Sequence, residues 1–210
     1  MIKLERTSVM NFENAVRGAR NPLNSWSKSD SYYNEAGNYI LGENDLSLCR
    51  RLAISGSDHR KYLRQIFVSV DITAPLYWWK EFDTYKVGTT ANSCSTMHKI
   101  HAKSFDRDDF SHDRMDDGAL ALLDATIDYL ESERQKFLED KSNRQPWHNM
   151  IQSLPSSYNQ MRTITLTYEN LLNQYKARKN HKLAEWHTYC DWIETLLYFK
   201  EMCLEDKSDG

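Results

Sequence analysis

The stretch 88–96, GTTANSCST, is small, rich in hydroxyl groups and almost free of charge. A loop of this composition offers backbone N–H groups and short side-chain donors to the oxygen atoms of a ligand. Runs of serine and threonine also form ordinary turns and helix caps. The composition alone therefore leaves a ligand-binding loop and a plain turn as alternatives.

Soft and imidazole metal ligands occur in the same region, in the spacing Cys94-x3-His98-x2-His101, with His187-x2-Cys190 further along the chain. Zinc sites usually combine tighter pairs, Cys-x2-Cys or His-x3-His, at both ends. We therefore expect no metal site, and we expect His98 and His101 to lie on a helix after the polar loop. The sequence also shows no phosphate-binding P-loop, no GxGxxG turn and no serine nucleophile elbow.

Composition bounds the class of protein. The 210 residues carry a formal net charge of −3, which gives no reason to expect a nucleic-acid partner. No run of roughly 18 apolar residues predicts a membrane span, and the N-terminal residues show no apolar signal segment. Four cysteines without a CxxC pair suit a reduced compartment, so we expect a cytoplasmic protein. The length predicts a single domain at 1–203 with a tail at 204–210.

The elements that must position the polar stretch begin just before it. Ile66–Ile72 is β-branched and aromatic and predicts a strand. A helix is expected to start near Thr73-Ala74-Pro75, because Thr73 can cap it and an early proline costs no helical hydrogen bond. The charged stretch 102–117 has no helical period and predicts a mobile loop that could act as a lid. Periodicity and capping residues further predict a short strand at 1–9 and helices at 11–20, 44–53, 118–140, 169–197 (with a break at 179–182) and 198–203.

The order of these features resembles the core of the flavin-dependent thymidylate synthases (ThyX). That family has a histidine at the flavin, then a strand, then a helix that begins Ala-Pro or similar and runs into an RHR motif. His59 falls at the histidine position, Ile66–Ile72 on the strand and Ala74-Pro75 on the helix start. The resemblance implies an α+β fold with a small, mostly antiparallel sheet flanked by two helical groups. For 158–168, whose β-branched residues leave strand and helix open, the resemblance implies a helix.

The family's binding motifs are altered in this sequence. Thr84-Tyr85-Lys86 falls on RHR, whose side chains contact the flavin in the family, and only Lys86 keeps a positive charge. Asn92-Ser93 falls on the family's Asn-Glu pair. Ser95 falls on the family's serine, and the serine-arginine end of that motif contacts the deoxyuridylate phosphate. Met97 or His98 stands where the family has its last arginine. The resemblance thus implies cofactor contacts at His59, Thr84, Tyr85 and Lys86, and substrate contacts at Asn92, Ser93 and Ser95.

A second match lies near the C-terminus. Leu171–Arg178 covers the family's N-x-R-S-L-x-x-F-L-x-L-R segment, and Ala184–His187 covers its A-Q-W-E-I segment. Arg178 falls on the last arginine, which engages and polarises the pyrimidine ring in the family. A guanidinium suits that role because it presents paired donors and stays charged. The family's other arginine, a phosphate ligand, falls on Glu169. Taken without the resemblance, Arg178 is one residue of a solvated basic patch.

The helix at 11–20 and the polar loop that follows it form the last candidate region. In the family an early helix and loop of this kind border the active site. The resemblance therefore implies candidate residues for contacts with the phosphate or the base, namely Arg17, Arg20, Asn24 and Ser25. A surface turn after a helix is the simpler interpretation of the same residues.

Two functions follow as hypotheses. The first is a divergent flavin-dependent thymidylate synthase-like enzyme that methylates dUMP, with FAD, NADPH and methylenetetrahydrofolate as the implied cofactor and co-substrates, and with Arg178 as the catalytic residue. The family's sites are shared by four subunits, so a homotetramer is implied, and the six tryptophans agree with it. The second is a ThyX-fold nucleotide-binding or interaction protein without flavin chemistry, which the Thr84-Tyr85-Lys86 replacement favours.

Overall fold

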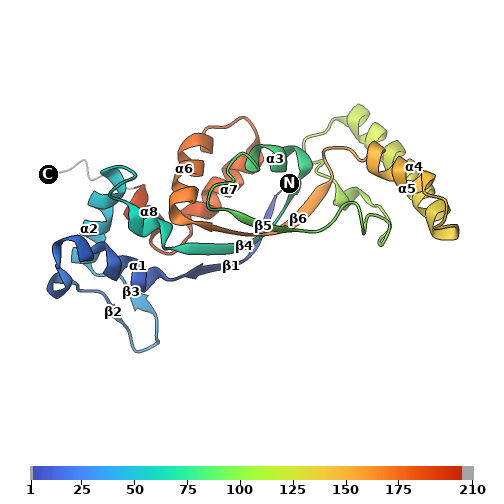
Figure 1. The fold of residues 1–210 in the computed structure, drawn as a ribbon. Helices are drawn as coiled ribbons and strands as arrows, with labels where there is room; N and C mark the ends of the chain where they lie inside the picture. The colour runs from blue at the N-terminus through green and yellow to red at the C-terminus, as the bar shows by residue number, and fades with distance from the viewer. Residues whose placement is uncertain (1, 205–210) are drawn as a thin grey trace. The chain divides into compact units, whose positions relative to one another are not determined.

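The structure, a computed structural model, describes residues 2–204 and mixes helices with a small antiparallel sheet (Figure 1). A four-stranded sheet has the order β1-β4-β6-β5, built from β1 (Lys3–Met10), β4 (Phe67–Pro75), β6 (Asn159–Thr167) and β5 (Thr90–Ser93). A second sheet pairs β2 (Tyr32–Tyr33) with β3 (Tyr39–Ile40) in antiparallel register. The helices are α1 (Phe12–Ala19), α2 (Glu43–Ile54), α3 (Leu76–Phe82), α4 (Asp117–Glu139), α5 (Gln145–Ser153), α6 (Tyr168–Arg178), α7 (Ala184–Glu194) and α8 (Phe199–Cys203). The predicted α+β class is confirmed.

The chain is divided into two compact units. The first unit comprises Met1–Lys3, Asp71–Thr84 and Asn92–Thr163, and the second comprises Leu4–Val70, Tyr85–Ala91 and Ile164–Gly210. The single domain expected at 1–203 stays a prediction, and residues 205–210 of the expected tail lie outside the described residues. Across residues 2–204, no helix has the length and apolar character needed to cross a membrane.

The core of the first unit lies where α4 packs against α5. Phe105 and Phe110 enter this core from the stretch 102–117, and a short 3₁₀ helix at Arg107–Asp109 separates them. The side chains of Arg107 and Asp124 form an ion pair between that short helix and α4. The stretch is therefore attached to the core at several points, and its mobility stays a prediction. The cluster comprises Ile100, Phe105, Phe110, Leu123, Leu130, Phe137 and Met150.

The core of the second unit is aromatic. Tyr168 at the start of α6 meets Phe199 of α8 edge to face, with ring centroids 5.1 Å apart, and also contacts Phe12 of α1. Trp186 and Tyr189 of α7 are fully buried and pack against each other in the same way. Edge-to-face packing of this kind adds to the burial of large apolar area. These contacts fix α6, the helix that ends at Arg178.

Strand β4 runs further than its sequence indicates. The extended backbone continues through Pro75, so Thr73 lies in the strand and does not cap the helix, which begins at Leu76. The first two N–H groups of α3 instead donate to the carbonyls of Tyr158 and Ser156, each at 3.0 Å. Those bonds supply the partners that an N-cap side chain would otherwise provide.

Three further local predictions were wrong. Residues 159–167 form strand β6, because the β-branched residues there alternate between buried Ile164 and Leu166 and less buried Thr163 and Thr165, which is the period of a strand. The polar stretch 88–96 is only partly a loop, since Thr90–Ser93 forms β5. His98 and His101 lie in turns and not on a helix.

Candidate functional site

Arg178 and Tyr85 meet in the second unit. Arg178 is the last residue of α6, and its Nε–H donates to the Tyr85 hydroxyl at 2.9 Å. The guanidinium carbon of Arg178 lies 4.9 Å from the centroid of the Trp186 ring and 5.6 Å from that of Tyr85. Stacking on aromatic faces suits a guanidinium, which is planar and weakly hydrated. The structure thus brings together one residue of the expected cofactor triplet and the expected catalytic arginine.

A tight turn after Tyr85 is joined to the start of α6. Thr167 and Asn170 form a capping box at the N-terminus of α6, and the Asn170 amide also donates to the Val87 carbonyl at 2.7 Å. Gly88 has a φ of +74°, and a Cβ at this position would lie 3.1 Å from Asn170 Oδ1. The turn therefore needs glycine both for its backbone conformation and for the close approach of Asn170. Both ends of α6 contact the 85–88 segment, which holds Tyr85 beside Arg178.

Glu169 pairs with two arginines that follow His59 in sequence. Arg60 Nε donates to one Glu169 carboxylate oxygen at 2.8 Å, and Arg64 Nη1 donates to the other at 2.9 Å. The Arg60 side chain is 15% exposed and the Glu169 side chain 12%, so the pair is partly shielded from water. The residue at the position of the family's phosphate arginine is thus an acid that neutralises neighbouring arginines.

His59 lines a cavity of the second unit with a volume of about 730 Å³. Its backbone N–H donates to the Gly56 carbonyl within the turn that follows α2. The lining combines apolar side chains, Leu48 and Leu52 of α2, with polar ones, Asp58 and Gln65. A cavity of this volume and mixed lining is typical of sites for small molecules and cofactors.

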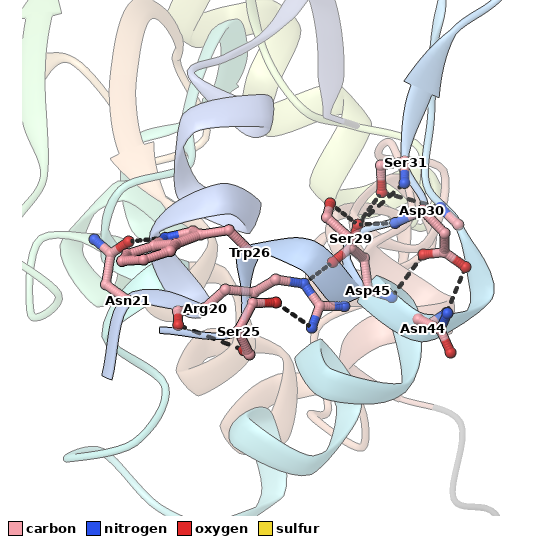
Figure 2. A network of polar contacts seen from close by, with 10 residues as sticks. Arg20, Asn21, Ser25, Trp26, Ser29, Asp30, Ser31, Asn44 and Asp45 are labelled. Carbon is pink, nitrogen blue, oxygen red and sulfur yellow. Dashed lines mark hydrogen bonds and ion pairs between the residues drawn. The ribbon is translucent and has the colours of Figure 1, made fainter. Parts of the chain in front are cut away.

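Arg20 is buried and lies in a dense polar network (Figure 2). It also lines a second, smaller cavity. Its Nε donates to Asp45 Oδ1 at 2.5 Å, and its Nη1 donates to the Ser25 carbonyl at 3.4 Å. The other oxygen of Asp45 accepts hydrogen bonds from the hydroxyl groups of Ser29 and Ser31. Arg17, one turn earlier on α1, is exposed, lines the same cavity and donates to Asn14.

Asp45 stays ionised in spite of its burial. Burial raises the pKa of the Asp45 carboxyl, but hydrogen bonds from Ser31 and Ser29 and the ion pair with Arg20 outweigh it and hold the pKa below its usual value. Asp45 lies in the first turn of α2 and does not cap the helix. The Asp30 carboxylate caps the helix from outside, since it accepts from the N–H groups of Asn44 and Asp45.

The remaining expected residues are spread over the surface. Thr84 lies two residues after the end of α3, and its hydroxyl donates to the Glu81 carbonyl at 2.7 Å; Lys86 is exposed. Asn92 and Ser93 lie on β5 and are exposed, while Ser95 follows β5 and accepts from the His98 N–H at 3.0 Å. Thr84, Asn92, Ser93 and Ser95 belong to the first unit, whereas His59, Tyr85, Lys86, Arg17, Arg20 and Arg178 belong to the second.

Two features of the second unit escaped sequence reasoning. The pairing of Glu169 with Arg60 and Arg64 joins residues more than 100 positions apart, and no short-range pattern indicates it. The network around Asp45 does carry a local signal, because Ser29, Asp30 and Ser31 form a compact polar run after Trp26. In the part of the chain that the structure describes, no group of three or more His, Cys, Asp and Glu side chains could hold a metal ion.

No protein-family model matches the chain, and no curated protein is similar to it in sequence. Solved structures do resemble it. Thymidylate synthase X (ThyX) from Helicobacter pylori with FAD and dUMP superposes with a TM-score of 0.70, and a second structure of the flavin-dependent enzyme from this organism, also with FAD and dUMP, has a TM-score of 0.66. In both comparisons the sequences are 15% identical and 98% of each chain is covered. The resemblance read from the sequence is thus confirmed at the level of structure: the chain has the ThyX fold.

Proposed function

We propose that this protein is a divergent ThyX-like enzyme that acts on a pyrimidine deoxynucleotide. The reaction that we expect is methylation of dUMP with reduced flavin and methylenetetrahydrofolate. The observation that carries the proposal is the Arg178–Tyr85 pair, because it fixes the guanidinium that the sequence resemblance aligns with the family's pyrimidine-polarising arginine. Both solved structures of this fold named above contain FAD and dUMP, which supports the same substrate class.

Arg178 would act by electrostatic stabilisation. A fixed guanidinium beside a pyrimidine carbonyl stabilises the negative charge that develops on its oxygen when the ring is attacked or loses a proton. The contacts with Tyr85 and Trp186 hold the group in place before substrate binds, so little reorganisation is needed. This role makes no use of a cysteine nucleophile on the protein.

The residues around His59 fit a flavin. The cavity of about 730 Å³ offers an apolar wall from Leu48 and Leu52 and a polar edge from His59 and Gln65, which suits a planar ring with polar margins. FAD, when bound, would supply the hydride. We expect His59, Thr84, Tyr85 and Lys86 to contact it, with Lys86 as the only cation of the triplet. NADPH and methylenetetrahydrofolate stay predictions as co-substrates, as do the substrate contacts of Asn92, Ser93, Ser95, Arg17 and Arg20.

Calorimetric titration with dUMP tests the proposal. Arg178→Ala should weaken binding at least tenfold while circular dichroism remains that of the wild type, because the change removes a charged donor at a helix end. Lys179→Ala is the matched control, since Lys179 is the next residue of the same basic patch. Equal affinity of the Arg178→Ala protein and the wild type for dUMP would exclude Arg178 from the site.

One observation favours a second candidate, a nucleotide-binding protein without flavin chemistry. The Thr84 hydroxyl is bound to the Glu81 carbonyl and the Tyr85 hydroxyl to Arg178, so two members of the triplet are engaged within the protein. The visible absorbance spectrum, recorded before and after addition of FAD and desalting, separates the candidates. A retained flavin band supports the enzyme. A colourless protein that dUMP still stabilises against heat supports the binding protein.

Assembly and location follow from the same proposal. A homotetramer is expected, and large apolar side chains exposed on this chain agree with it, since Leu23 is 82% exposed, Ile54 73% and Leu122 71%. Light scattering during size-exclusion chromatography should give four times the mass of the chain, 24.8 kDa. A monomer at micromolar concentration would contradict the assembly. A cytoplasmic location stays a prediction.

A further inference from the structure

Two side-chain contacts join α6 to α7 in the second unit, where the two helices lie side by side (Figure 1). On α6, Gln174 and Arg178 are one turn apart and share a face of the helix, and Trp186 and Tyr189 are related in the same way on α7. The Tyr189 hydroxyl donates to Gln174 Oε1 at 2.6 Å. The guanidinium carbon of Arg178 lies 4.9 Å from the centroid of the Trp186 ring. The hydrogen bond and the stacked guanidinium are therefore neighbouring contacts in one helix–helix interface.

The contact between Gln174 and Tyr189 is completely buried, since both residues are 0% exposed. Burial raises the pKa of the Tyr189 hydroxyl well above its usual value, so this group stays protonated and acts as a donor. A buried hydroxyl needs an acceptor, because it has lost its hydration. The position of α7 along α6 that brings the hydroxyl to Gln174 Oε1 is therefore favoured over neighbouring positions.

Gln174 is a costly residue at its position. Its amide nitrogen has no hydrogen-bond partner within residues 2–204, although the residue is fully buried. An unpaired buried donor lowers stability, and an apolar side chain of similar size would avoid that cost. Polar groups in a packed core can instead specify one arrangement of the elements around them. The contribution of Gln174 is thus better explained by the register of the helices than by stability.

The connection from Tyr189 to Arg178 runs through Trp186. The rings of Tyr189 and Trp186 meet edge to face, with centroids 5.6 Å apart and planes at 83°. The Trp186 ring also meets the Tyr85 ring, at 6.2 Å and 72°, so it contacts both members of the Arg178–Tyr85 pair. A shift of α7 along α6 would carry Trp186 away from the guanidinium, and the hydrogen bond between Arg178 and Tyr85 would lose its support.

We propose that Gln174 and Tyr189 are positioning residues, whose buried hydrogen bond sets the register of α7 on α6 and so holds Trp186 against Arg178. They act through Trp186 and not on a substrate. The inference rests on the proposed function only in that Arg178 is the group whose position serves the reaction.

The double variant Gln174→Met/Tyr189→Phe separates position from stability. It replaces both partners by apolar side chains of similar volume, so its thermal melting should be no lower than that of the wild type. The readout is the rate at which the Arg178 Nε–H exchanges with water, measured by NMR on the full chain labelled with ¹⁵N-arginine, without nucleotide. Arg178→Lys identifies the signal. We expect exchange about fivefold faster than in the wild type, because the hydrogen bond to Tyr85 opens more often.

Tyr175→Phe is the matched control. It also removes a hydrogen bond between α6 and α7, the one from the Tyr175 hydroxyl to Glu194 at 2.5 Å, and it should leave the exchange of the Arg178 Nε–H unchanged. Tyr189→Phe alone removes the proposed hydrogen bond by the loss of one oxygen and should also speed the exchange, so it decides the outcome if the double variant does not fold. Unchanged exchange in these variants, or an equal increase in Tyr175→Phe, would overturn the proposal.

The affinity for dUMP distinguishes this inference from the proposed function. Because the exchange rate is measured without nucleotide, it tests the positioning even if the wild type binds no dUMP. If the wild type binds dUMP, the double variant should bind it about fivefold less tightly. Faster exchange together with unchanged dUMP affinity would support the positioning and contradict the role proposed for Arg178.

Discussion

The Nε–H of Arg178 donates to the hydroxyl of Tyr85 across 93 residues of sequence, at a distance of 2.9 Å. Tyr85→Phe keeps the aromatic ring beneath the guanidinium and removes only the acceptor. We predict that the affinity for dUMP falls about fivefold, because Arg178 becomes less well oriented, and that the free energy of unfolding falls by about 1 kcal/mol. Calorimetry and urea unfolding measure both quantities. A Tyr85→Phe protein with unchanged dUMP affinity would show that the hydrogen bond has no positioning role.

Glu169 neutralises Arg60 and Arg64, so its removal should have two effects. Glu169→Gln leaves both guanidinium groups without a charged partner, and we expect a loss of about 2 kcal/mol in the free energy of unfolding. The same change should strengthen binding of inorganic phosphate, since two cations are released. Arg64→Gln, at a side chain 44% exposed, should cost less than 1 kcal/mol and serves as the control. Weaker phosphate binding by Glu169→Gln than by the wild type would contradict this account.

Gly42 precedes α2 at a point of close backbone approach. A Cβ at this position would lie 2.3 Å from Asp30 Cγ and 2.6 Å from the Asp30 carbonyl carbon. Gly42→Ala must therefore displace Asp30, whose carboxylate caps α2, and we predict a loss of about 2 to 3 kcal/mol in the free energy of unfolding. Gly118→Ala is the control, because its nearest neighbour would be Asp116 Oδ1 at 3.6 Å and alanine favours the helix. Similar thermal melting of the two variants would count against the steric argument.

Glu131 of α4 should contribute a pH-dependent share of stability. The hydrogen bonds from Arg134 outweigh burial and lower the pKa of Glu131 to about 2, with help from Gln135 and the Phe105 N–H. Because the folded pKa lies below the unfolded one, this stability is present above about pH 4.5 and is lost as the pH falls toward 2. Its size is on the order of 2 kcal/mol at neutral pH, since the side chain is 29% exposed.

The variant Glu131→Gln tests this pH dependence by urea unfolding. The free energy of unfolding of the variant should lie furthest below that of the wild type at pH 7. This difference should shrink steadily between pH 4 and pH 2. Glu139→Gln, at an exposed position of the same helix, should show no such trend. A difference between Glu131→Gln and the wild type that is constant from pH 7 to pH 2 would refute the ionic origin.

Sequence patterns predicted most helices well because each carries its own periodicity. The α4 pattern, for example, predicted 118–140, and the helix spans Asp117–Glu139. The prediction failed at 159–167 because the resemblance implies a helix there, whereas the β-branched residues around Ile164 favour a strand. At these residues the β preference of the side chains and the burial of one face both favour a strand.

The candidate site could be predicted only in part. Arg178 could be chosen from the sequence, by its residue type and its position relative to Ala184–His187. Its partner Tyr85 could not, because Tyr85 comes from a segment joined to α6 through the hydrogen bond between Asn170 and Val87. The burial of Arg20 is likewise a consequence of tertiary geometry, because its Nε donates to Asp45 and its Nη1 donates to the Ser25 carbonyl. Long-range pairing of this kind leaves no local pattern in a single sequence.

The most direct test of the central claim is release of tritium from dUMP labelled at C5, measured with FAD, NADPH and methylenetetrahydrofolate, since methylation at C5 must expel that hydrogen. We predict release by the wild type and by Lys179→Ala, and a loss of at least a hundredfold in Arg178→Ala with its fold intact. Release by Arg178→Ala at the wild-type rate would contradict the role assigned to Arg178. Absence of release by a wild-type protein that retains flavin would contradict the proposal that this chain methylates dUMP.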